Sequence, residues 1–149
     1  MTQDRKPKPR ALVVDDEPDI RELLGITLGR MQFDVETAGD QASALRRLGA
    51  GNYDVVLTDM RLPDGDGLDI VAWIQHNRPG VPVAVITAHG NVEAAVRALK
   101  LGAFDFISKP LDLVALRKLI VATLKLRVDD EGETPHDATQ PVVAPAAFK

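Results

Sequence analysis

Five short apolar runs alternate along the chain with segments in which apolar residues recur every three or four positions. The runs cover residues 11–14, 33–38, 55–59, 83–87 and 104–108. Runs of this length indicate strands, and all except 33–38 are apolar enough to be buried on both faces of a sheet. Because helical segments separate them, right-handed crossovers would join the strands into one parallel sheet.

The segments between the runs carry helix signals at their ends. Asp40 and Asn91 are placed to cap two helices, Gly102 to end the helix after Asn91, and Pro110 to open the last one. Residues 60–67 have the turn composition of a loop. The expected inward positions, helix by helix, are Ile20, Leu23, Leu24, Thr27, Leu28 and Met31; Ala44, Leu45 and Leu48; Leu68, Ile70, Val71 and Ile74; Val92, Ala95, Val96 and Leu99; and Leu113, Leu116, Ile120 and Leu124.

Polar side chains stand where the strands end. They are Asp15 and Asp16 after the first strand, Asp59 at the end of the third, Thr87 at the end of the fourth, and Lys109 after the fifth. The carboxyl ends of parallel strands share one edge of a sheet, so we expect these groups to converge. Singly, each has an ordinary interpretation as a helix cap, a strand-end hydroxyl or a surface lysine. Together, three carboxylates, a hydroxyl and an ammonium suit a divalent cation and a phosphoryl group.

Composition narrows the class of protein. The chain has 149 residues, of which 45% are apolar, and this is enough for one domain with a sizeable core. A formal net charge of -4 argues against nonspecific nucleic-acid binding, and the absence of cysteine excludes a disulfide scaffold. No apolar stretch reaches membrane-spanning length, and residues 1–10 lack the apolar core of an export signal. A cytoplasmic location is expected.

The chain divides into three parts. Residues 1–9 are expected to be disordered and residues 10–127 to form the folded domain. Residues 128–139 carry five acidic residues without helical periodicity, and residues 140–147 are rich in proline, alanine and valine. The segment 128–149 is therefore expected to be a linker or tail. It would either be inert or lead to an effector domain beyond this sequence.

Four motifs, in this order, resemble those of the receiver domain of bacterial two-component response regulators. They are Asp15-Asp16, the sequence Thr-Asp-Met-Arg-Leu-Pro-Asp-Gly at 58–65, Thr-Ala-His-Gly at 87–90, and Lys109-Pro110. The resemblance covers residues 10–127. Within the family, segments 14–31 and 102–110 most resemble receivers of the NtrC type, which precede a sigma-54-activating ATPase and a DNA-binding domain. Regulators of type IV pilus genes are the nearest likeness.

The resemblance implies a flavodoxin-like α/β fold, with a doubly wound five-stranded parallel sheet in the order 2-1-3-4-5. It also implies that Asp59 accepts a phosphoryl group from a sensor histidine kinase. Beyond its own phosphorylation and dephosphorylation, the chain is not expected to be an enzyme. Phosphorylation would alter the face formed by the fourth helix, fifth strand and fifth helix, favour a homodimer and control an attached transcription-activating effector. No direct contact with nucleic acid or membrane is expected.

Mg²⁺ is the cofactor that the resemblance implies. Asp16, Asp59 and the backbone carbonyl of Arg61 would bind it directly, and Asp15 would hold it through water. General chemistry agrees, because an aspartate that attacks phosphorus among other anions needs a cation that neutralises the cluster.

By resemblance, Lys109 and Thr87 would each contact a phosphoryl oxygen. Thr87 would also form a switch with Phe106, where many receivers have tyrosine; the alternative is that Phe106 is an ordinary core residue. Arg61 and His89 would tune the loss of the phosphoryl group, since a solitary histidine is a poor metal ligand. A cis peptide bond after Lys109 would aim the lysine into the site.

Three other functions compete with this interpretation. The alternative within the family is a stand-alone, phosphorylation-dependent interaction module. A phosphatase or mutase with an aspartyl-phosphate intermediate would resemble a pattern with a second aspartate two positions after Asp59, but Arg61 stands there. A phosphorylation-independent module would have lost the acceptor or a metal ligand, and neither is lost here.

Overall fold

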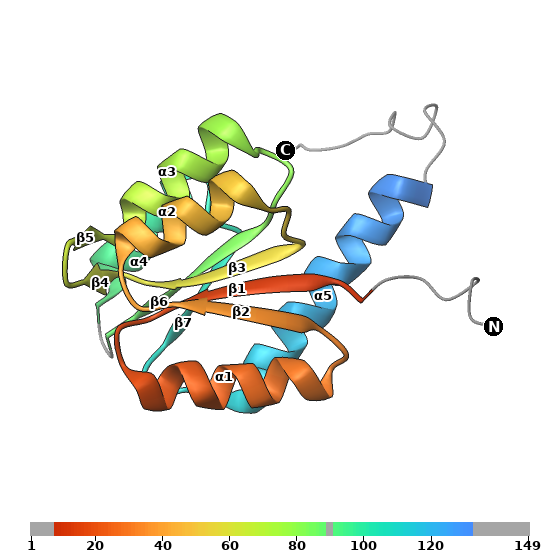
Figure 1. Ribbon diagram of the computed structural model, residues 1–149, viewed down its shortest axis with the longest axis horizontal. Coiled ribbons are helices and arrows are strands. Elements are labelled where there is room, and N and C mark those ends of the chain that lie inside the picture. Colours follow the sequence, from red (N-terminus) through yellow and green to blue (C-terminus); the bar gives the residue numbers. More distant parts are fainter. Residues whose placement is uncertain (1–7, 89–90, 133–149) are drawn as a thin grey trace.

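The computed structural model describes residues 8–88 and 91–132, with side chains described as far as Lys125. Strands and helices alternate along the described chain (Figure 1). The elements are β1 (Arg10–Val14), α1 (Pro18–Arg30), β2 (Asp34–Ala38), α2 (Gln41–Ala50), β3 (Val55–Asp59), β4 (Arg61–Leu62), β5 (Gly65–Asp66), α3 (Gly67–Asn77), β6 (Val83–Thr87), α4 (Val92–Leu101), β7 (Asp105–Ser108) and α5 (Leu113–Gly132).

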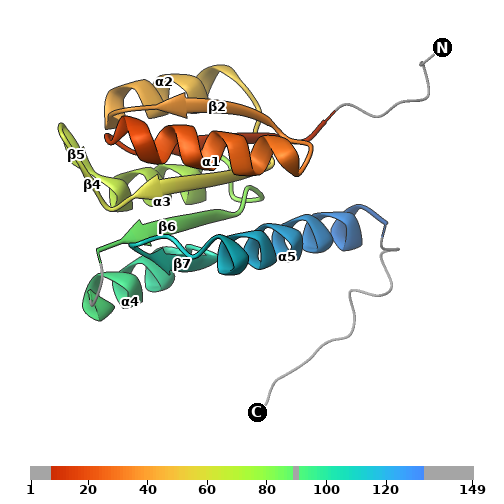
Figure 2. The same ribbon diagram turned by 90° about the horizontal axis from the view of Figure 1, so that it is seen from below.

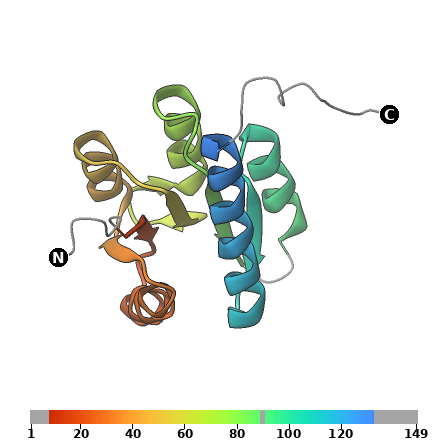
Figure 3. The same cartoon turned by 90° about the vertical axis from the view of Figure 1, so that its right-hand side faces the viewer.

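Five of the strands form one parallel sheet in the order β2-β1-β3-β6-β7. This is the predicted order 2-1-3-4-5, because the short strands β4 and β5 lie outside the sheet. Helices α2, α3 and α4 pack on one face and α1 and α5 on the other, each over its own apolar core (Figures 1 and 3). The doubly wound architecture is therefore confirmed.

Two predicted helix caps are confirmed. Asp40 accepts a hydrogen bond from the backbone N–H of Ser43 at 2.8 Å, and Asn91 accepts one from the N–H of Ala94 at 3.2 Å. Gly102 ends α4 with φ 115°, a left-handed conformation that glycine adopts without a steric penalty. These residues fix where α2 and α4 begin and end.

The segment predicted as loop 60–67 contains a small antiparallel ribbon. Strand β4 pairs with β5, so that Arg61 faces Asp66 and Leu62 faces Gly65. The turn composition was recognised from the sequence, but two-residue strands are too short to leave a pattern. The ribbon projects from the sheet edge directly after Asp59, as Figure 1 shows.

The predicted inward face of α4 is right for Ala95 and wrong for its other three residues. Val92, Val96 and Leu99 are exposed, and α4 buries Ala94 and Ala98 together with Ala95. The alanines form a second stripe at helical spacing, and their small side chains let the helix lie close to its neighbours. Leu23 of α1 is another predicted inward residue that is exposed, at the margin of its helix's buried stripe.

The last helix begins later than predicted. It starts at Leu113, because the carboxylate of Asp112 accepts the N–H groups of Val114 and Ala115 at 3.0 and 3.2 Å. Helix α5 then continues to Gly132, into the segment expected to be a linker, and runs past β7 (Figure 2). No glycine or proline interrupts it before Gly132.

The fifth strand of the sheet is half exposed rather than buried on both faces. In β7, Ile107 is buried, whereas Phe106 and Ser108 are exposed. This strand is the edge of the sheet, so it has a partner strand on one side only. Among the described residues, no helix combines the length and apolarity that a membrane span requires.

Candidate functional site

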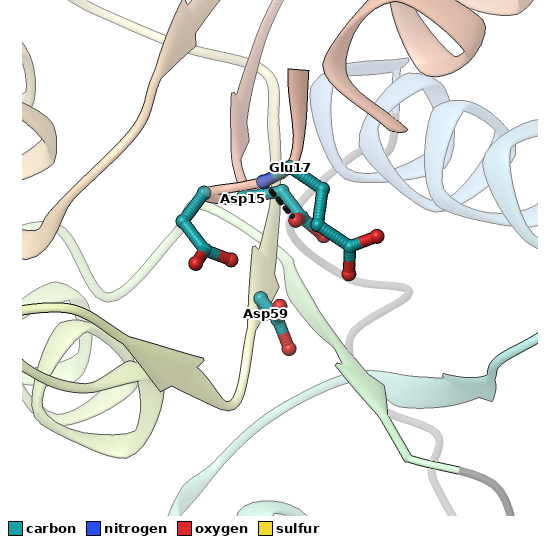
Figure 4. Close-up of side chains that lie close together, drawn as sticks. Asp15, Glu17 and Asp59 are labelled. Atoms are coloured by element: carbon teal, nitrogen blue, oxygen red, sulfur yellow. Dashed lines mark hydrogen bonds between the residues drawn. The ribbon is translucent and has the colours of Figure 1, made fainter. Parts of the chain in front are cut away.

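Four acidic residues meet at the carboxyl ends of β1 and β3. One carboxylate oxygen from each of Asp15, Asp16, Glu17 and Asp59 lies within 4.8 Å of the others. Figure 4 shows Asp15, Glu17 and Asp59 around the ends of these strands. The three predicted aspartates are thus brought together, as expected from parallel strands that end at one edge.

Asp15 is fully buried and only partly satisfied. Its Oδ1 accepts the N–H of Glu17 at 2.9 Å, while its Oδ2 has no hydrogen-bond partner and lies at ion-pair distance, 3.3 Å, from Lys109 Nζ. Burial, together with the nearby charge of Asp59, raises the pKa of the Asp15 carboxyl. A buried carboxylate oxygen without a hydrogen bond, in a cluster of four acids, fits the coordination of a hard cation by oxygen.

Lys109 is the cation that faces this cluster. Its Nζ lies 2.8 Å from Glu17 Oε2, 3.1 Å from Asp59 Oδ2 and 3.3 Å from Asp15 Oδ2. Burial alone would lower the pKa of the ammonium, but hydrogen bonds to Glu17 and Asp59 outweigh that effect and the pKa is raised. One ammonium among four carboxylates leaves an excess of negative charge for a divalent ion to neutralise.

The backbone holds Lys109 in place beside the cluster. The peptide bond between Lys109 and Pro110 is cis, as the sequence analysis anticipated. The N–H of Lys109 donates to the carbonyl of Thr87 at 2.8 Å, which ties the lysine to the end of β6. Thr87 itself is buried at the end of β6.

An open pocket lies over the acidic cluster. Its volume is about 300 Å³, and it is lined by Asp16, Glu17, Asp59, Met60, Arg61, Ala88, Asn91 and Lys109. Arg61 donates its backbone N–H toward Asp59 Oδ1 at 3.4 Å, while its side chain is exposed. Asp59 and Lys109, which contact each other at 3.1 Å, both line the pocket, so a small anion bound there would lie against both, close to carboxylates that suit a cation.

Phe106 is not one of the residues that line the pocket. Phe106 is 38% exposed on the edge strand, which excludes the alternative that it is an ordinary core residue. His89 lies outside the described residues. The pocket therefore gathers Asp16, Asp59 and Lys109, while Phe106 stands on the exposed edge strand.

Glu17 was not identified from the sequence. It lies at the N-cap of α1, where it makes no side-chain cap, and its carboxylate instead points to Lys109. The sequence signal was weak, because an acidic residue before a helix is ordinarily attributed to the helix dipole. An acidic residue directly after two aspartates at a strand end could have been included in the cluster by position.

The fold and this pocket define a receiver domain. The chain belongs to the response regulator receiver domain family, because the sequence profile of that family matches residues 11–121. It is 53% identical over 130 residues to the response regulator protein PilR of Pseudomonas aeruginosa, covering 87% of this chain and 29% of that protein. The predicted likeness to NtrC-type regulators is also confirmed. The chain is 37% identical over 109 residues to the DNA-binding transcriptional regulator NtrC of Rhizobium meliloti, covering 73% of this chain and 22% of that protein.

Solved structures show the same fold. The receiver domain of NtrX from Brucella abortus superposes with a TM-score of 0.74 at 38% identity, covering 77% of this chain and 98% of that one. A receiver domain protein from Clostridium thermocellum superposes with a TM-score of 0.75 at 31% identity, covering 80% of this chain and 96% of that one. The chain spans less than a third of the length of the first curated relatives it matches.

Proposed function

We propose that this receiver accepts a phosphoryl group on Asp59 from the phosphohistidine of a sensor kinase. The observation that carries the proposal is the placement of Asp59 at the end of β3, 3.1 Å from Lys109 and inside the acidic cluster. A carboxylate oxygen of Asp59 would attack phosphorus, forming a P–O bond. The P–N bond to the imidazole would break, and the imidazole nitrogen would keep the electron pair and take up a proton.

Mg²⁺ is the cofactor that this site would use. Asp16, Asp59 and the Arg61 carbonyl would bind it, with Asp15 holding it through water. When bound, the ion neutralises the cluster and the charge on the phosphoryl oxygens. The fit rests on the four clustered carboxylates and on the buried Asp15 oxygen that lacks a hydrogen bond.

The remaining groups would position the phosphoryl oxygens. The ammonium of Lys109 would move from its shared contact with Glu17 and Asp59 to one of these oxygens, and Thr87 would donate its hydroxyl to another. Arg61 and His89 would set how fast water removes the phosphoryl group. The chain would catalyse its own phosphorylation and dephosphorylation and no other reaction.

Output would pass through α4, β7 and α5. Movement of Thr87 toward the phosphoryl group would change the packing of Phe106, whose exposed ring has no phenol oxygen and so depends on packing alone. The exposed Val92, Val96 and Leu99 add apolar area on α4, the helix that contacts β7, and a second copy could cover it. A phosphorylated homodimer would result.

By analogy with PilR and NtrC, the dimer would control an attached effector that activates sigma-54-dependent transcription, including type IV pilus genes. The receiver itself would not contact DNA. A second candidate function is a stand-alone, phosphorylation-dependent interaction module, which the same site and face would serve.

One titration tests the acceptor, the metal and the switch together. Beryllofluoride and Mg²⁺ should shift the backbone NMR signals of residues around Asp59 and, with them, those of α4 and β7. Sedimentation of the same samples should show a larger mass. Absence of shifts at Asp59 would refute the phosphoacceptor assignment. Shifts confined to its neighbourhood, with an unchanged mass over a wide concentration range, would refute signalling through pairing of this domain.

A further inference from the structure

The β4–β5 ribbon is tied to the N-terminal end of α2. The carboxylate of Asp64, in the turn of the ribbon, accepts the backbone N–H of Gln41 at 2.7 Å through Oδ1 and that of Ala42 at 3.0 Å through Oδ2. The Gln41 side chain adds hydrogen bonds to the Asp66 carbonyl at 3.0 Å and to Asp69 Oδ2 at 3.1 Å. Three hydrogen bonds thus join the ribbon to α2, and the bond to Asp69 joins α2 to α3.

These contacts fill the anion-binding end of α2. The first N–H groups of a helix have no acceptor inside the helix, and the helix dipole makes that end positive. Asp40 accepts the N–H of Ser43, and Asp64 accepts the N–H groups of Gln41 and Ala42. Two carboxylates therefore share one helix end, one local and one contributed by the ribbon. Of Asp40 and Asp64, only Asp64 connects α2 to the ribbon that follows Asp59.

The ribbon is held by close contacts both at its turn, next to Asp64, and at its end near the site. A Cβ on Gly65 would lie 2.5 Å from Gln41 Nε2, so the turn is already in close contact with α2. At the other end of the ribbon, Gly67 donates its N–H to the Met60 carbonyl at 2.8 Å. Arg61 lies between these points, paired across the ribbon with Asp66. A displacement of the turn would therefore move the Arg61 backbone.

We propose that Asp64 is a positioning residue, which holds the Arg61 carbonyl where the metal site needs it by anchoring the ribbon to the N-terminus of α2. The inference rests on the proposed function, because the Arg61 carbonyl matters only if the site binds Mg²⁺. Asp64 does not contact the acidic cluster itself. Its effect would be transmitted through the backbone of the ribbon, as outer-shell partners of metal ligands act.

Asp40 provides a matched control for the experiment. Asp40→Ala removes a carboxylate cap from the same helix end but leaves the ribbon attached, whereas Asp64→Ala removes a cap and two of the three hydrogen bonds that hold the ribbon to α2. Both variants should lower the melting temperature of the domain. Only Asp64→Ala should weaken Mg²⁺ binding, by about tenfold, the low end of the effect that loss of an outer-shell partner has on metal affinity.

Calorimetric titration of Mg²⁺ into the chelator-treated full chain measures the affinity, and amide NMR shifts of Met60 and Arg61 report the ribbon. Displaced amide signals with weaker binding in Asp64→Ala, but not in Asp40→Ala, are the expected result. Equal Mg²⁺ affinity in the two variants would overturn the inference. If Asp64→Ala does not fold, Asp64→Asn, which keeps one carbonyl acceptor, should show the same direction of change. Failure of the unsubstituted chain to bind Mg²⁺ would instead refute the proposed function.

Discussion

Lys109 Nζ lies closer to Glu17 Oε2, at 2.8 Å, than to either aspartate carboxylate that it contacts. The Glu17 side chain is 56% exposed, so this ion pair is screened by solvent and contributes little to stability. The Glu17 carboxylate matters because it competes with a phosphoryl oxygen for the ammonium of Lys109. If Lys109 must reach a phosphoryl oxygen, it has to give up part of its contact with Glu17, and this contact then opposes phosphorylation.

Glu17→Gln should therefore speed phosphorylation at saturating Mg²⁺. An exposed ion pair is worth at most about 1 kcal/mol, which limits the acceleration to about fivefold. The rate of labelling by acetyl phosphate measures the effect. Glu22→Gln, on the exposed side of the same helix, removes the same charge at a position outside the pocket and should leave the rate unchanged. Slower labelling of the Glu17 variant would mean that the carboxylate assists the reaction.

Asp59→Asn should abolish labelling by acetyl phosphate or by a cognate kinase. The amide keeps the shape of the side chain but is not a nucleophile, so no P–O bond can form. Mass spectrometry of the intact chain measures the added phosphoryl group. Asp105→Asn, on the half-exposed edge strand, is a control that should retain full labelling. Persistent stoichiometric labelling of the Asp59 variant would mean that another residue accepts the phosphoryl group.

Asp15→Asn should stabilise the metal-free domain at neutral pH, because the amide removes the free-energy penalty of a buried carboxylate charge close to Asp59. Because the folded state raises the pKa of Asp15, the penalty is absent below the ordinary value of 3.8 and develops as pH rises through the folded-state pKa. The gap in melting temperature between variant and parent should therefore widen from pH 4 to pH 7. A constant gap would indicate that ionisation of Asp15 is not the cause.

The two adjacent aspartates should differ in their effect on Mg²⁺ affinity. Asp16 is exposed to the pocket and is proposed as a direct ligand, whereas Asp15 is buried, with one oxygen occupied by the N–H of Glu17. Asp16→Ala should weaken binding more than Asp15→Ala, because a direct ligand is lost in one case and a contact through water in the other. Calorimetric titration distinguishes them. Equal losses would contradict this division of roles.

The sheet and the acidic site were predictable for one physical reason. Strands buried on both faces leave continuous apolar runs, and parallel strands place the residues after those runs at one edge. One site could therefore be assigned from the sequence alone to Asp15, Asp16, Asp59 and Lys109. The N-terminal caps of α2 and α4 were predictable because a side chain only three residues away accepts the bond.

The features that could not be predicted from the sequence depend on contacts between distant segments. Helix α4 has two apolar stripes, and the neighbouring elements, rather than hydrophobicity, select the alanine stripe over Val92, Val96 and Leu99. The bond from Asp64 to α2 spans 23 positions and has no local signature. The contact between Glu17 and Lys109 spans 92 positions. Pairings of this kind become visible only when the fold brings the segments together.

Gly67 provides a stability prediction that tests the geometry around Asp59 without phosphorylation. A Cβ at Gly67 would lie 2.0 Å from the Asp59 carbonyl oxygen and 3.1 Å from Met60 Cα, and both contacts are with backbone, which cannot move aside cheaply. Gly67→Ala should therefore cost about 3 kcal/mol or more in the free energy of unfolding, as overpacking does at rigid sites.

Gly25→Ala is the matched control, because a Cβ at this position in α1 meets nothing within 4 Å. Alanine in a helix interior is favoured over glycine, so this variant should gain about 0.5–1 kcal/mol. Urea unfolding measures both values. If Gly67→Ala proved as well tolerated as Gly25→Ala, the backbone where the ribbon ends and α3 begins could not lie against the Asp59 carbonyl as the structure has it. The anchoring of the Arg61 carbonyl through Asp64 would then lose its mechanical basis, because a ribbon with room to shift would not transmit the contact at α2 to the site.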